Sequence, residues 1–450
     1  MGLYSKLFLV IALVCYLSCT STSTNTTLTE DLRDVALNET TDEPAPLKGI
    51  VLWPDNDKIN NYKNSIALEY SYCLPCQIVI GKSGEKIQYN WSSLETLLND
   101  IASRGHQAII RFRYEYPGKK IAKNTSGCTS DVTGATAVPA YIKGLSDYSE
   151  TYSSNPGGDG NTYYADWSNS ELQWFTKQFY KDFAEKYDSD PRIAFLQVGF
   201  GHWSEYHIYG TSLKLGINFP SKNYQMEFLQ IMNDAFKKTP WSISIDAADN
   251  SYAPIVGNSA LMGLKFGLFD DSFMHKEHND YNESCWNQIG TNRWKTAPGG
   301  GEISYYTSND QKNALNPAGM YGRTWEQQAA KFHITYMIAN DAVDGTHATV
   351  ERVREASINS GYKFQITKYQ ASDAQAIITV KNIGVAPLYH DAYVTVKEKR
   401  SDTSLKELLP GEEQEYIVDV VINANENPKP TITSDKILPG KTIPYQALIL

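Results

Sequence analysis

The sequence predicts an α/β fold, a (β/α)8 TIM barrel followed by a small C-terminal β-sandwich. Between Lys48 and Gly361, eight short apolar runs alternate with amphipathic helical segments. Eight strands in this order favour a closed barrel over an open doubly wound sheet. The first run is not followed by a glycine-rich phosphate loop, which also argues against a nucleotide-binding sheet. After Gly361 the helical periods give way to alternating apolar runs between Gly and Pro turns, the pattern of a β domain.

Residues 1–19 have the pattern of an export signal, with one Lys near the start, an apolar stretch and a small residue before Cys19. The stretch is too short to span a bilayer as a finished helix. Ser18-Cys19 is similar to a bacterial lipobox, in which the thiol is acylated. We therefore expect export from a bacterial cell to the periplasm or cell surface, or as an outer-membrane lipoprotein attached through Cys19. Residues 20–46, rich in Thr, Asn and acids, predict a disordered tether.

The barrel domain is expected over residues 47–361. Its eight expected strands are Gly49–Trp53, Ser65–Tyr72, Gln107–Arg113, Ile193–Gly199, Trp241–Ala247, Leu264–Phe269, Gly300–Ser304 and Thr346–Val350. Three helices between them begin with a capping box, a Ser or Thr followed three residues later by Glu or Gln. The boxes are Ser92 with Glu95, Ser168 with Glu171, and Thr324 with Gln327. Helical spacing of apolar residues extends the last helix to Tyr336 and Met337.

Residues 362–450 are expected to form the β-sandwich. Alternating runs such as Ala376–Val380, Ala392–Val396 and Glu415–Val421 are separated by turns. This part of the chain contains no Trp, which favours a structural appendage over an independent sugar-binding module.

The composition limits the kinds of partner. A formal net charge of -10 argues against nucleic acid and against an anionic membrane surface. Aromatic residues make up 12% of the chain, with 30 Tyr and 9 Trp. Such rings suit the faces and hydroxyl edges of sugars, although an aromatic-rich core is an equally good interpretation.

The cysteines are assigned no chemistry. Once the signal is removed and Cys19 is acylated, Cys73, Cys76, Cys128 and Cys285 remain. Disulfides are permitted in an exported protein, so Cys73 and Cys76 either bridge locally or pair elsewhere. A redox or zinc role is less favoured because there is no second CxxC.

The first candidate site follows the fourth expected strand. The apolar run Ile193–Val198 is typical of a strand buried on both faces, and a burst of His, aromatic and acidic residues follows it at once. In a barrel the chemistry lies where strands end, so Glu205 is a catalytic candidate. The residues around it with expected substrate contacts are His202, Trp203, Tyr206 and His207. The alternative is a solvated loop in which Glu205 makes a surface ion pair.

The second candidate is Glu302, on the seventh expected strand. Carboxylates on strands four and seven face each other across the barrel mouth, and hydrolysis of a glycosidic bond needs such a pair. The run Gly299–Gly301 would let substrate or backbone approach closely. The alternative is a flexible turn with an exposed acid.

The sequence resembles a group of exported bacterial proteins of a domain of unknown function. The pieces that carry the resemblance are GIVLW (49–53), QAIIRFRYEYPG (107–118), VGFGHWSEYH (198–207), LFDDSFMHKEH (268–278) and PGGGEISYY (298–306). The group is similar to glycoside hydrolases of the (β/α)8 clan with catalytic acids on strands four and seven. The resemblance implies that Glu205 is the acid/base and Glu302 the nucleophile of a retaining mechanism, with Ser204 where the clan usually has Asn.

Further candidates lie at other strand ends. Arg111, Arg113 and Glu115 share one face of the third strand, where an Arg holds Glu302 ionised or, equally well, Arg111 pairs with Glu115. The remaining expected substrate contacts are Trp53, Tyr70, Tyr72, Asp246, Asp271, His275, Glu277 and His278. The last four are dense enough in His and carboxylate to bind an ion, but their spacing matches no standard zinc signature, so no metal is assigned.

These observations favour a glycoside hydrolase that cleaves a poly- or oligosaccharide and uses no cofactor. The alternative is a non-catalytic glycan-binding protein of a cell-surface uptake system on the same barrel. A metal-dependent hydrolase, or a lyase that uses Tyr and His, is a third and less favoured class.

Overall fold

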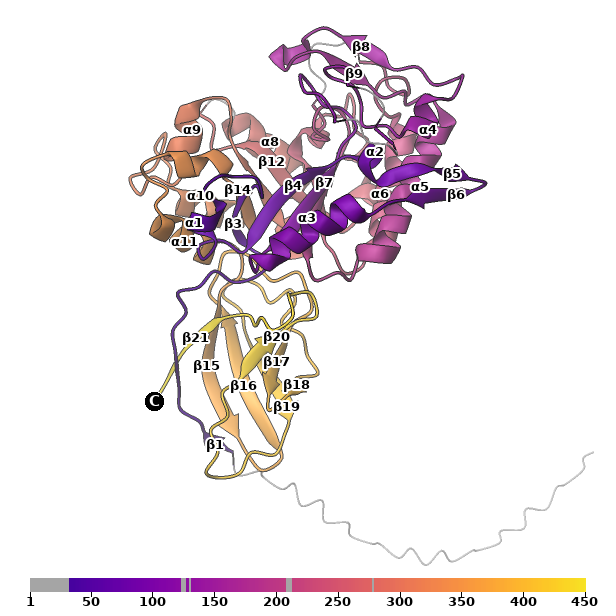
Figure 1. Ribbon diagram of the computed structural model, residues 1–450. Coiled ribbons are helices and arrows are strands. Elements are labelled where there is room, and N and C mark those ends of the chain that lie inside the picture. Colours follow the sequence, from indigo (N-terminus) through magenta and orange to yellow (C-terminus); the bar gives the residue numbers. More distant parts are fainter. Residues whose placement is uncertain (1–31, 123–126, 129–130, 208–212, 277–278) are drawn as a thin grey trace, which may run out of the picture.

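The computed structural model describes residues 32–122, 127–128, 131–207, 213–276 and 279–450. Eight parallel strands close into a barrel, which confirms the predicted barrel (Figure 1). In order around the barrel they are β3 (Gly49–Leu52), β4 (Leu68–Cys73), β7 (Gln107–Phe112), β10 (Ile193–Val198), β11 (Trp241–Ser244), β12 (Gly267–Phe273), β13 (Gly299–Ile303) and β14 (Tyr336–Ile338). Most of their side chains are buried, which explains why the strands read as unbroken apolar runs.

The eighth strand is the one that the sequence analysis places wrongly. Residues 346–349 form a loop, and Val350 is the first residue of α11 (Val350–Ile358), with Thr349 as the helix cap. The strand is Tyr336–Ile338, of which the helical spacing places Tyr336 and Met337 in the preceding helix. That helix, α10 (Trp325–Lys331), ends five residues before the strand begins. A three-residue apolar strand is too short to be told from a helical turn by its periodicity.

The longer helices lie where amphipathic segments predict them. They are α3 (Ser92–Ser103), α5 (Ser170–Tyr187), α6 (Lys222–Ala235), α8 (Asn279–Gly290), α10 and α11. Helix α5 buries Leu172, Phe175, Phe179 and Phe183, a row at helical spacing. Of the three expected capping boxes only Thr324 with Gln327 forms; α5 is capped by Asn169 instead, and no side chain caps α3.

Short elements line the ends of the barrel. The short helices are α1 (Ile59–Tyr62), α2 (Pro75–Ile78), α4 (Ala140–Lys143), α7 (Ser259–Met262) and α9 (Ser308–Asn313), with 3-10 turns η1 (Pro156–Gly158), η2 (Ile245–Ala248), η3 (Arg293–Lys295) and η4 (Asn340–Asp344). There are also two antiparallel strand pairs: β5 (Val79–Ser83) with β6 (Lys86–Tyr89), and β8 (Thr151–Ser153) with β9 (Thr162–Tyr164). Among the described residues no helix is long and apolar enough to cross a membrane.

The C-terminal unit consists of two sheets whose buried side chains form one apolar cluster. Its strands are β15 (Phe364–Ala371), β16 (Gln375–Asn382), β17 (Tyr393–Val396), β18 (Lys399–Arg400), β19 (Glu413–Asp419), β20 (Thr431–Thr433) and β21 (Tyr445–Ile449). The larger sheet has the order β19-β16-β15-β21-β2, and the smaller is β18-β17-β20.

Part of the expected tether belongs to this larger sheet. The strand β1 (Arg33–Asp34) pairs with β15, and β2 (Leu37–Glu39) pairs with β21. Val35 and Leu37 are buried there, so residues 32–46 are not the free tether that their polar composition predicts. Two apolar side chains at alternate positions are enough to add an edge strand to an existing sheet. Residues 1–31, with the expected signal and Cys19, lie outside the described residues.

The C-terminal unit covers the amino-terminal end of the barrel, as Figure 1 shows. Gln107, the first residue of β7, donates to the carbonyl of Lys436, and His390 contacts the carbonyl of Ala194 on β10. Side chains of both parts belong to one buried cluster. The opposite end, where the strands finish, is therefore the end available for a site.

The cysteines settle one alternative left open by the sequence. Cys76 forms a disulfide with Cys128, and Cys73 and Cys285 are free and buried. The bridge connects α2 to the long loop after β7, so it fixes that loop beside the carboxyl ends of the strands.

Candidate active site

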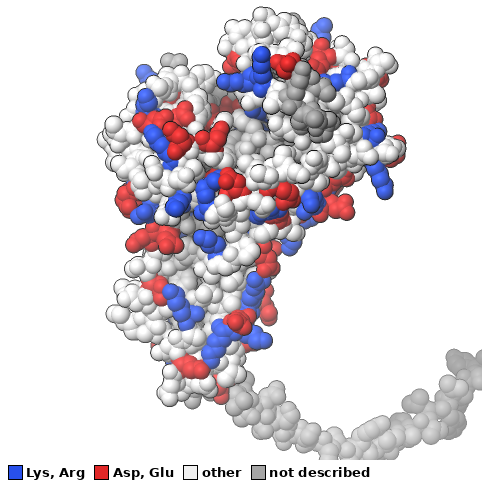
Figure 2. All heavy atoms as spheres, in the orientation of Figure 1, with Lys and Arg blue, Asp and Glu red and all other residues white. Residues whose placement is uncertain are grey.

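Polar residues gather at the carboxyl ends of seven of the eight barrel strands. Glu205 follows β10, Asp246 lies in η2 after β11, and Glu302 lies on β13. The remaining contributors are Tyr72 on β4, Arg111 and Arg113 at the end of β7, Asp271 on β12 and Asp341 in η4 after β14. Figure 2 shows that this face is hollowed between the side that carries α9 and the lobe that carries β8 and β9.

Glu205 is held by an unusually tight turn. Trp203, Ser204 and Tyr206 all have positive φ, a conformation that costs free energy for residues other than Gly. Backbone hydrogen bonds from Glu205 to His202 and from Tyr206 to Phe200 close the turn. A side chain at Gly199 would come within 2.2 Å of the Ser204 carbonyl, which explains the glycine there. The surface-loop alternative is therefore wrong, because Glu205 is only 4% exposed.

Arg111 is the cation that contacts Glu205. Its Nη1 makes an ion pair with the Glu205 carboxylate, and its Nε donates to Gln197 Oε1 at 3.0 Å. Gln197 in turn donates to the hydroxyl of Tyr336 at 2.8 Å. The Tyr72 hydroxyl lies 3.4 Å from Glu205 Oε1. This buried network fixes the orientation of Glu205 through side chains of β4, β7, β10 and β14.

His207 links the other oxygen of Glu205 to two aspartates. Its Nδ1 lies 3.7 Å from Glu205 Oε2, and its Nε2 lies 2.7 Å from Asp271 and 3.1 Å from Asp246. Burial opposes charge on the imidazole, but Asp271, Asp246 and Glu205 outweigh it and raise the pKa of His207 well above its usual value. The ring is therefore an imidazolium at neutral pH.

Glu205, His207 and Asp271 also place three possible ligand atoms within 4.8 Å of one another, a spacing that could hold a metal ion. Two of these groups are ion-paired to each other through a protonated ring nitrogen. The His207 ring lies in ion-pair contact with Asp271 and Asp246, so we interpret the cluster in this structure as a charge network.

Glu302 has a different environment. It lies on a strand and is 7% exposed, so the alternative of a flexible exposed turn is wrong. Among the described residues it makes no ion pair. Added side chains at Gly300 and Gly301 would come within 2.4 Å of the Tyr336 ring and 2.1 Å of the Asp270 carbonyl. These glycines therefore allow neighbouring barrel strands to approach closely.

Glu302 is not the ionised group that the expected nucleophile role requires. Burial, followed by the charge of Glu205, raises the pKa of Glu302 well above its usual value. Burial also raises the pKa of Glu205, but Arg111 and His207 counteract it. The sequence analysis expects an Arg beside Glu302; Arg111 instead pairs with Glu205, because β7 is the direct neighbour of β10. Arg111 does not pair with Glu115 either.

Replacing Glu302 by Gln should make the protein more stable than wild type, increasingly so as the pH rises above 4.5. The pKa of Glu302 is higher in the folded chain than in the unfolded chain. Between these two pKa values the unfolded chain has released the proton and the folded chain still holds it, so the stability of the wild type falls as the pH rises. Thermal unfolding of both proteins between pH 5 and 9 measures this. Glu283→Gln, a surface change on α8, is the control. A stability difference that does not vary with pH would contradict the raised pKa of Glu302.

Aromatic side chains surround the two acids. Trp53, Tyr72 and Trp203 are half-buried, whereas Tyr70 and Tyr206 are buried. Trp53, Tyr70 and Tyr72 form one set, with ring centroids 5.2 to 6.1 Å apart. The half-buried rings are the ones available for contact with a ligand.

Two expected contacts are engaged elsewhere. His202 is buried between Tyr164, 2.5 Å away, and Asp159, 3.2 Å away. His275 contacts Asp310 at 2.6 Å. These histidines hold loops together. Glu277 and His278 lie outside the described residues.

The sequence analysis missed Gln197, Tyr336, Asp341 and Tyr305. Tyr305 is exposed three residues after Glu302, and the charge of Glu302 acts on it; Asp341 contributes to the raised pKa of Glu302. The position of Asp341 just after β14 would have identified it if the eighth strand had been placed correctly. Gln197 and Tyr336 lie inside the barrel and carry no sequence signal.

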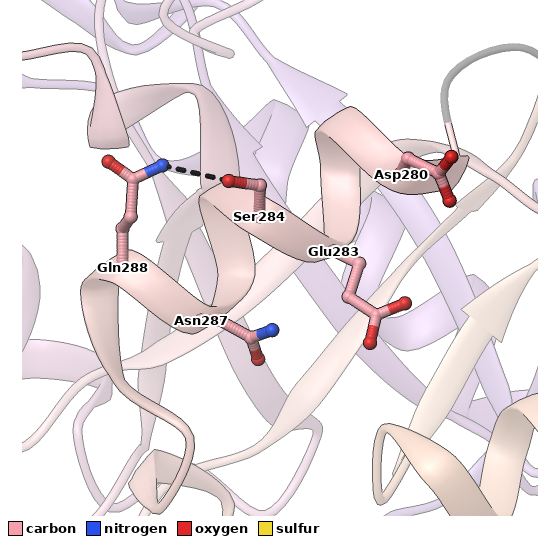
Figure 3. Close-up of a pocket in the computed structure, with 5 residues that line it drawn as sticks. All are labelled: Asp280, Glu283, Ser284, Asn287 and Gln288. Atoms are coloured by element: carbon pink, nitrogen blue, oxygen red, sulfur yellow. Dashed lines mark hydrogen bonds between the residues drawn. The ribbon is translucent and has the colours of Figure 1, made fainter.

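Two cavities lie away from these acids. A surface pocket of about 460 Å³ on α8 is lined by Asp280, Glu283, Ser284, Asn287 and Gln288 (Figure 3). A second, of about 280 Å³, is bordered by Arg104, Gly105 and Lys441 at the amino-terminal end of the barrel. The two buried carboxyl groups with raised pKa values lie at the carboxyl end of the barrel, which is therefore the candidate active site.

Comparison with known proteins gives similarity of fold. No family model and no curated protein matches the chain. Similar solved structures are endo-glycoceramidase II from Rhodococcus sp. as a lactosyl-enzyme intermediate (10% identity, 86% of this chain and 100% of that chain, TM-score 0.43) and the catalytic domain of β-amylase from Paenibacillus polymyxa (12%, 70% and 98%, 0.39). The α-amylase of Geobacillus thermoleovorans in complex with acarbose is another (9%, 83% and 98%, 0.34). The structural neighbours are thus barrel glycoside hydrolases, but at such low identities and TM-scores the likeness carries no argument about this chain.

Proposed function

We propose that the protein is a glycoside hydrolase that cleaves a poly- or oligosaccharide with Glu205 and Glu302. The observation that carries this proposal is an unequal pair of buried carboxyl groups at the mouth of the barrel. Their charges act on each other, yet only Glu205 has a cation partner. Hydrolysis of a glycosidic bond needs this inequality, with one group protonated and the other ionised.

The charges assign the roles. Glu302 holds its proton in the free protein and donates it to the leaving oxygen. Glu205 is kept ionised by Arg111 and attacks the anomeric carbon. This reverses the roles that the resemblance implies but keeps its retaining mechanism, in which the acid later acts as base toward water. For such a pair the carboxyl groups should lie roughly 5–5.5 Å apart.

We also propose that the protein acts in the bacterial cell envelope, as a lipoprotein anchored through Cys19 or in secreted form. The pattern of residues 1–19 supports export, and the disulfide between Cys76 and Cys128 suits an oxidising compartment. The half-buried rings of Trp53, Tyr72 and Trp203 suit contact with sugar faces.

The test is hydrolysis of a panel of glycans, measured as the release of new reducing ends. At least one glycan should be cleaved by the wild type and not by the double variant Glu205→Gln/Glu302→Gln, which should still bind it. The anomer released first, observed by NMR, should match the configuration of the substrate. Binding of a glycan by the wild type without cleavage would contradict the hydrolase and support a binding protein.

A further inference from the structure

Arg113 is a buried cation beside the candidate active site. It follows β7, its side chain is 5% exposed, and its guanidinium lies over the rings of Tyr72 and Tyr116, 3.6 and 4.0 Å from their centroids. Tyr72 also contacts Glu205 through its hydroxyl, so one tyrosine connects Arg113 to the carboxyl pair. Arg113 therefore lies one side chain away from Glu205.

Arg113 differs from the other buried cations of the described chain. Lys48 donates to two carbonyls, Arg111 is held by Glu205 and Gln197, and Lys436 donates to two carbonyls and a hydroxyl. Within the same described residues, the guanidinium of Arg113 makes no ion pair and no hydrogen bond. Its Nε is buried and has no hydrogen-bond partner, whereas its two terminal nitrogens are not completely buried.

A buried guanidinium without a counter-ion is costly. Burial lowers the pKa of Arg113 and outweighs the attraction of its neighbours, Glu205 among them, which is consistent with a guanidinium that makes no ion pair among the described residues. Two ring faces offset part of this cost by cation–π attraction, but they leave the N–H groups unpaired. The nearby carboxylate, Glu205, is already paired with Arg111. A group that supplies negative charge and oxygen acceptors would complete the site.

We propose that Arg113 is a subsite for an anionic substituent, a carboxylate or a sulfate ester, on the sugar that binds next to Glu205. This inference rests on the proposed function. A guanidinium offers parallel N–H donors that match the oxygens of such groups in a bidentate contact. A neutral sugar would leave the cation unpaired. The substrate class is therefore an acidic glycan, built from uronic acids or sulfated sugars.

Stability in the absence of ligand provides the first test. Arg113→Met removes an uncompensated charge and keeps an apolar side chain between the two rings, so its melting temperature should equal or exceed that of the wild type. Arg293→Met is the matched control. Arg293 also lies over an aromatic ring, Phe266, but donates to four carbonyls, and its replacement should lower the melting temperature. A lower melting temperature for Arg113→Met would mean that Arg113 is structural and would overturn the proposal.

Binding provides the second test, with probes that differ in one group. D-Glucuronate, D-glucose 6-sulfate and D-glucose, and the corresponding galactose series, are compared by thermal shift at equal ionic strength. The wild type should bind one of the two anionic forms roughly 10- to 100-fold more tightly than the neutral sugar, and Arg113→Met should lose that preference. Which anion is preferred separates uronic acids from sulfated sugars.

The same comparison separates this proposal from the hydrolase proposal. If the wild type and Arg113→Met show the same thermal shift with every probe, whether they bind it or not, the anionic subsite is overturned. This holds whatever the protein hydrolyses. If the preference is present but no glycan is cleaved, the subsite stands and the hydrolase proposal fails.

Discussion

Glu205→Gln is expected to abolish turnover on every substrate, whereas Glu302→Gln should slow the first chemical step only when the leaving group is poor. A nucleophile is needed for each bond cleavage. A general acid, in contrast, is needed only where the departing oxygen must be protonated, and its loss costs roughly 10²–10⁴-fold in rate. Aryl glycosides of the accepted sugar, with phenol and dinitrophenol as leaving groups, separate the two cases when the burst of phenol release is measured.

The reverse pattern would restore the roles that the resemblance implies. A large loss in Glu302→Gln with both leaving groups, and a loss in Glu205→Gln with the poor one alone, would make Glu302 the nucleophile. Small and equal losses in both variants would remove the pair from the mechanism. Glu283→Gln, on the surface of α8, controls for general effects of amide substitution.

The pH dependence follows from the same assignment. Glu205 must be ionised and Glu302 protonated, so kcat/KM should fall on the acidic side as Glu205 gains a proton and on the basic side as Glu302 loses one. Both limbs should lie above the usual range for a carboxyl group, because the pKa values of both are raised. In Glu302→Gln the basic limb should disappear.

The positions of the two acids could be predicted because barrel geometry depends on strand count and strand ends. The buried run Ile193–Val198 and the polar burst after it were enough to place Glu205, and counting strands placed Glu302. The misplaced eighth strand does not affect the position of either acid, since it lies after both in the chain. It did conceal Asp341, which follows the true strand Tyr336–Ile338.

The charges of the site could not be predicted from the sequence. Alternation puts Arg111 and Arg113 on one face of their strand, but not beside a particular acid. That choice depends on the register between strands, in which Gln197 lies opposite Arg111, and on the turn that brings Glu205 back over them. Arg113 points to two rings instead, one of which, Tyr116, comes from the long loop after β7.

Arg111 should have the largest effect on stability among the residues of the site. Both Arg111 and Glu205 are buried, 1% and 4% exposed, and removal of one partner leaves the other charge without compensation. Such a loss costs about 3–5 kcal/mol of unfolding free energy. Arg111→Met should therefore lose about this amount at neutral pH, measured by urea denaturation. Arg111→Lys should lose less, since it keeps the charge but lacks the fork that reaches Glu205 and Gln197 together.

The loss in Arg111→Met should grow as the pH rises. Without Arg111 the pKa of Glu205 in the folded chain moves further above its unfolded value, so the folded variant holds a proton that the unfolded chain has released. The stability of the variant then decreases as the pH rises from the unfolded to the folded pKa of Glu205. At low pH its stability approaches that of the wild type, because Glu205 is neutral in the folded and in the unfolded chain. Glu205→Gln in the same background should recover most of the loss and remove its pH dependence. If the double variant is as unstable as Arg111→Met, the stabilisation arises from packing around Arg111, and the ion pair is not what keeps Glu205 ionised.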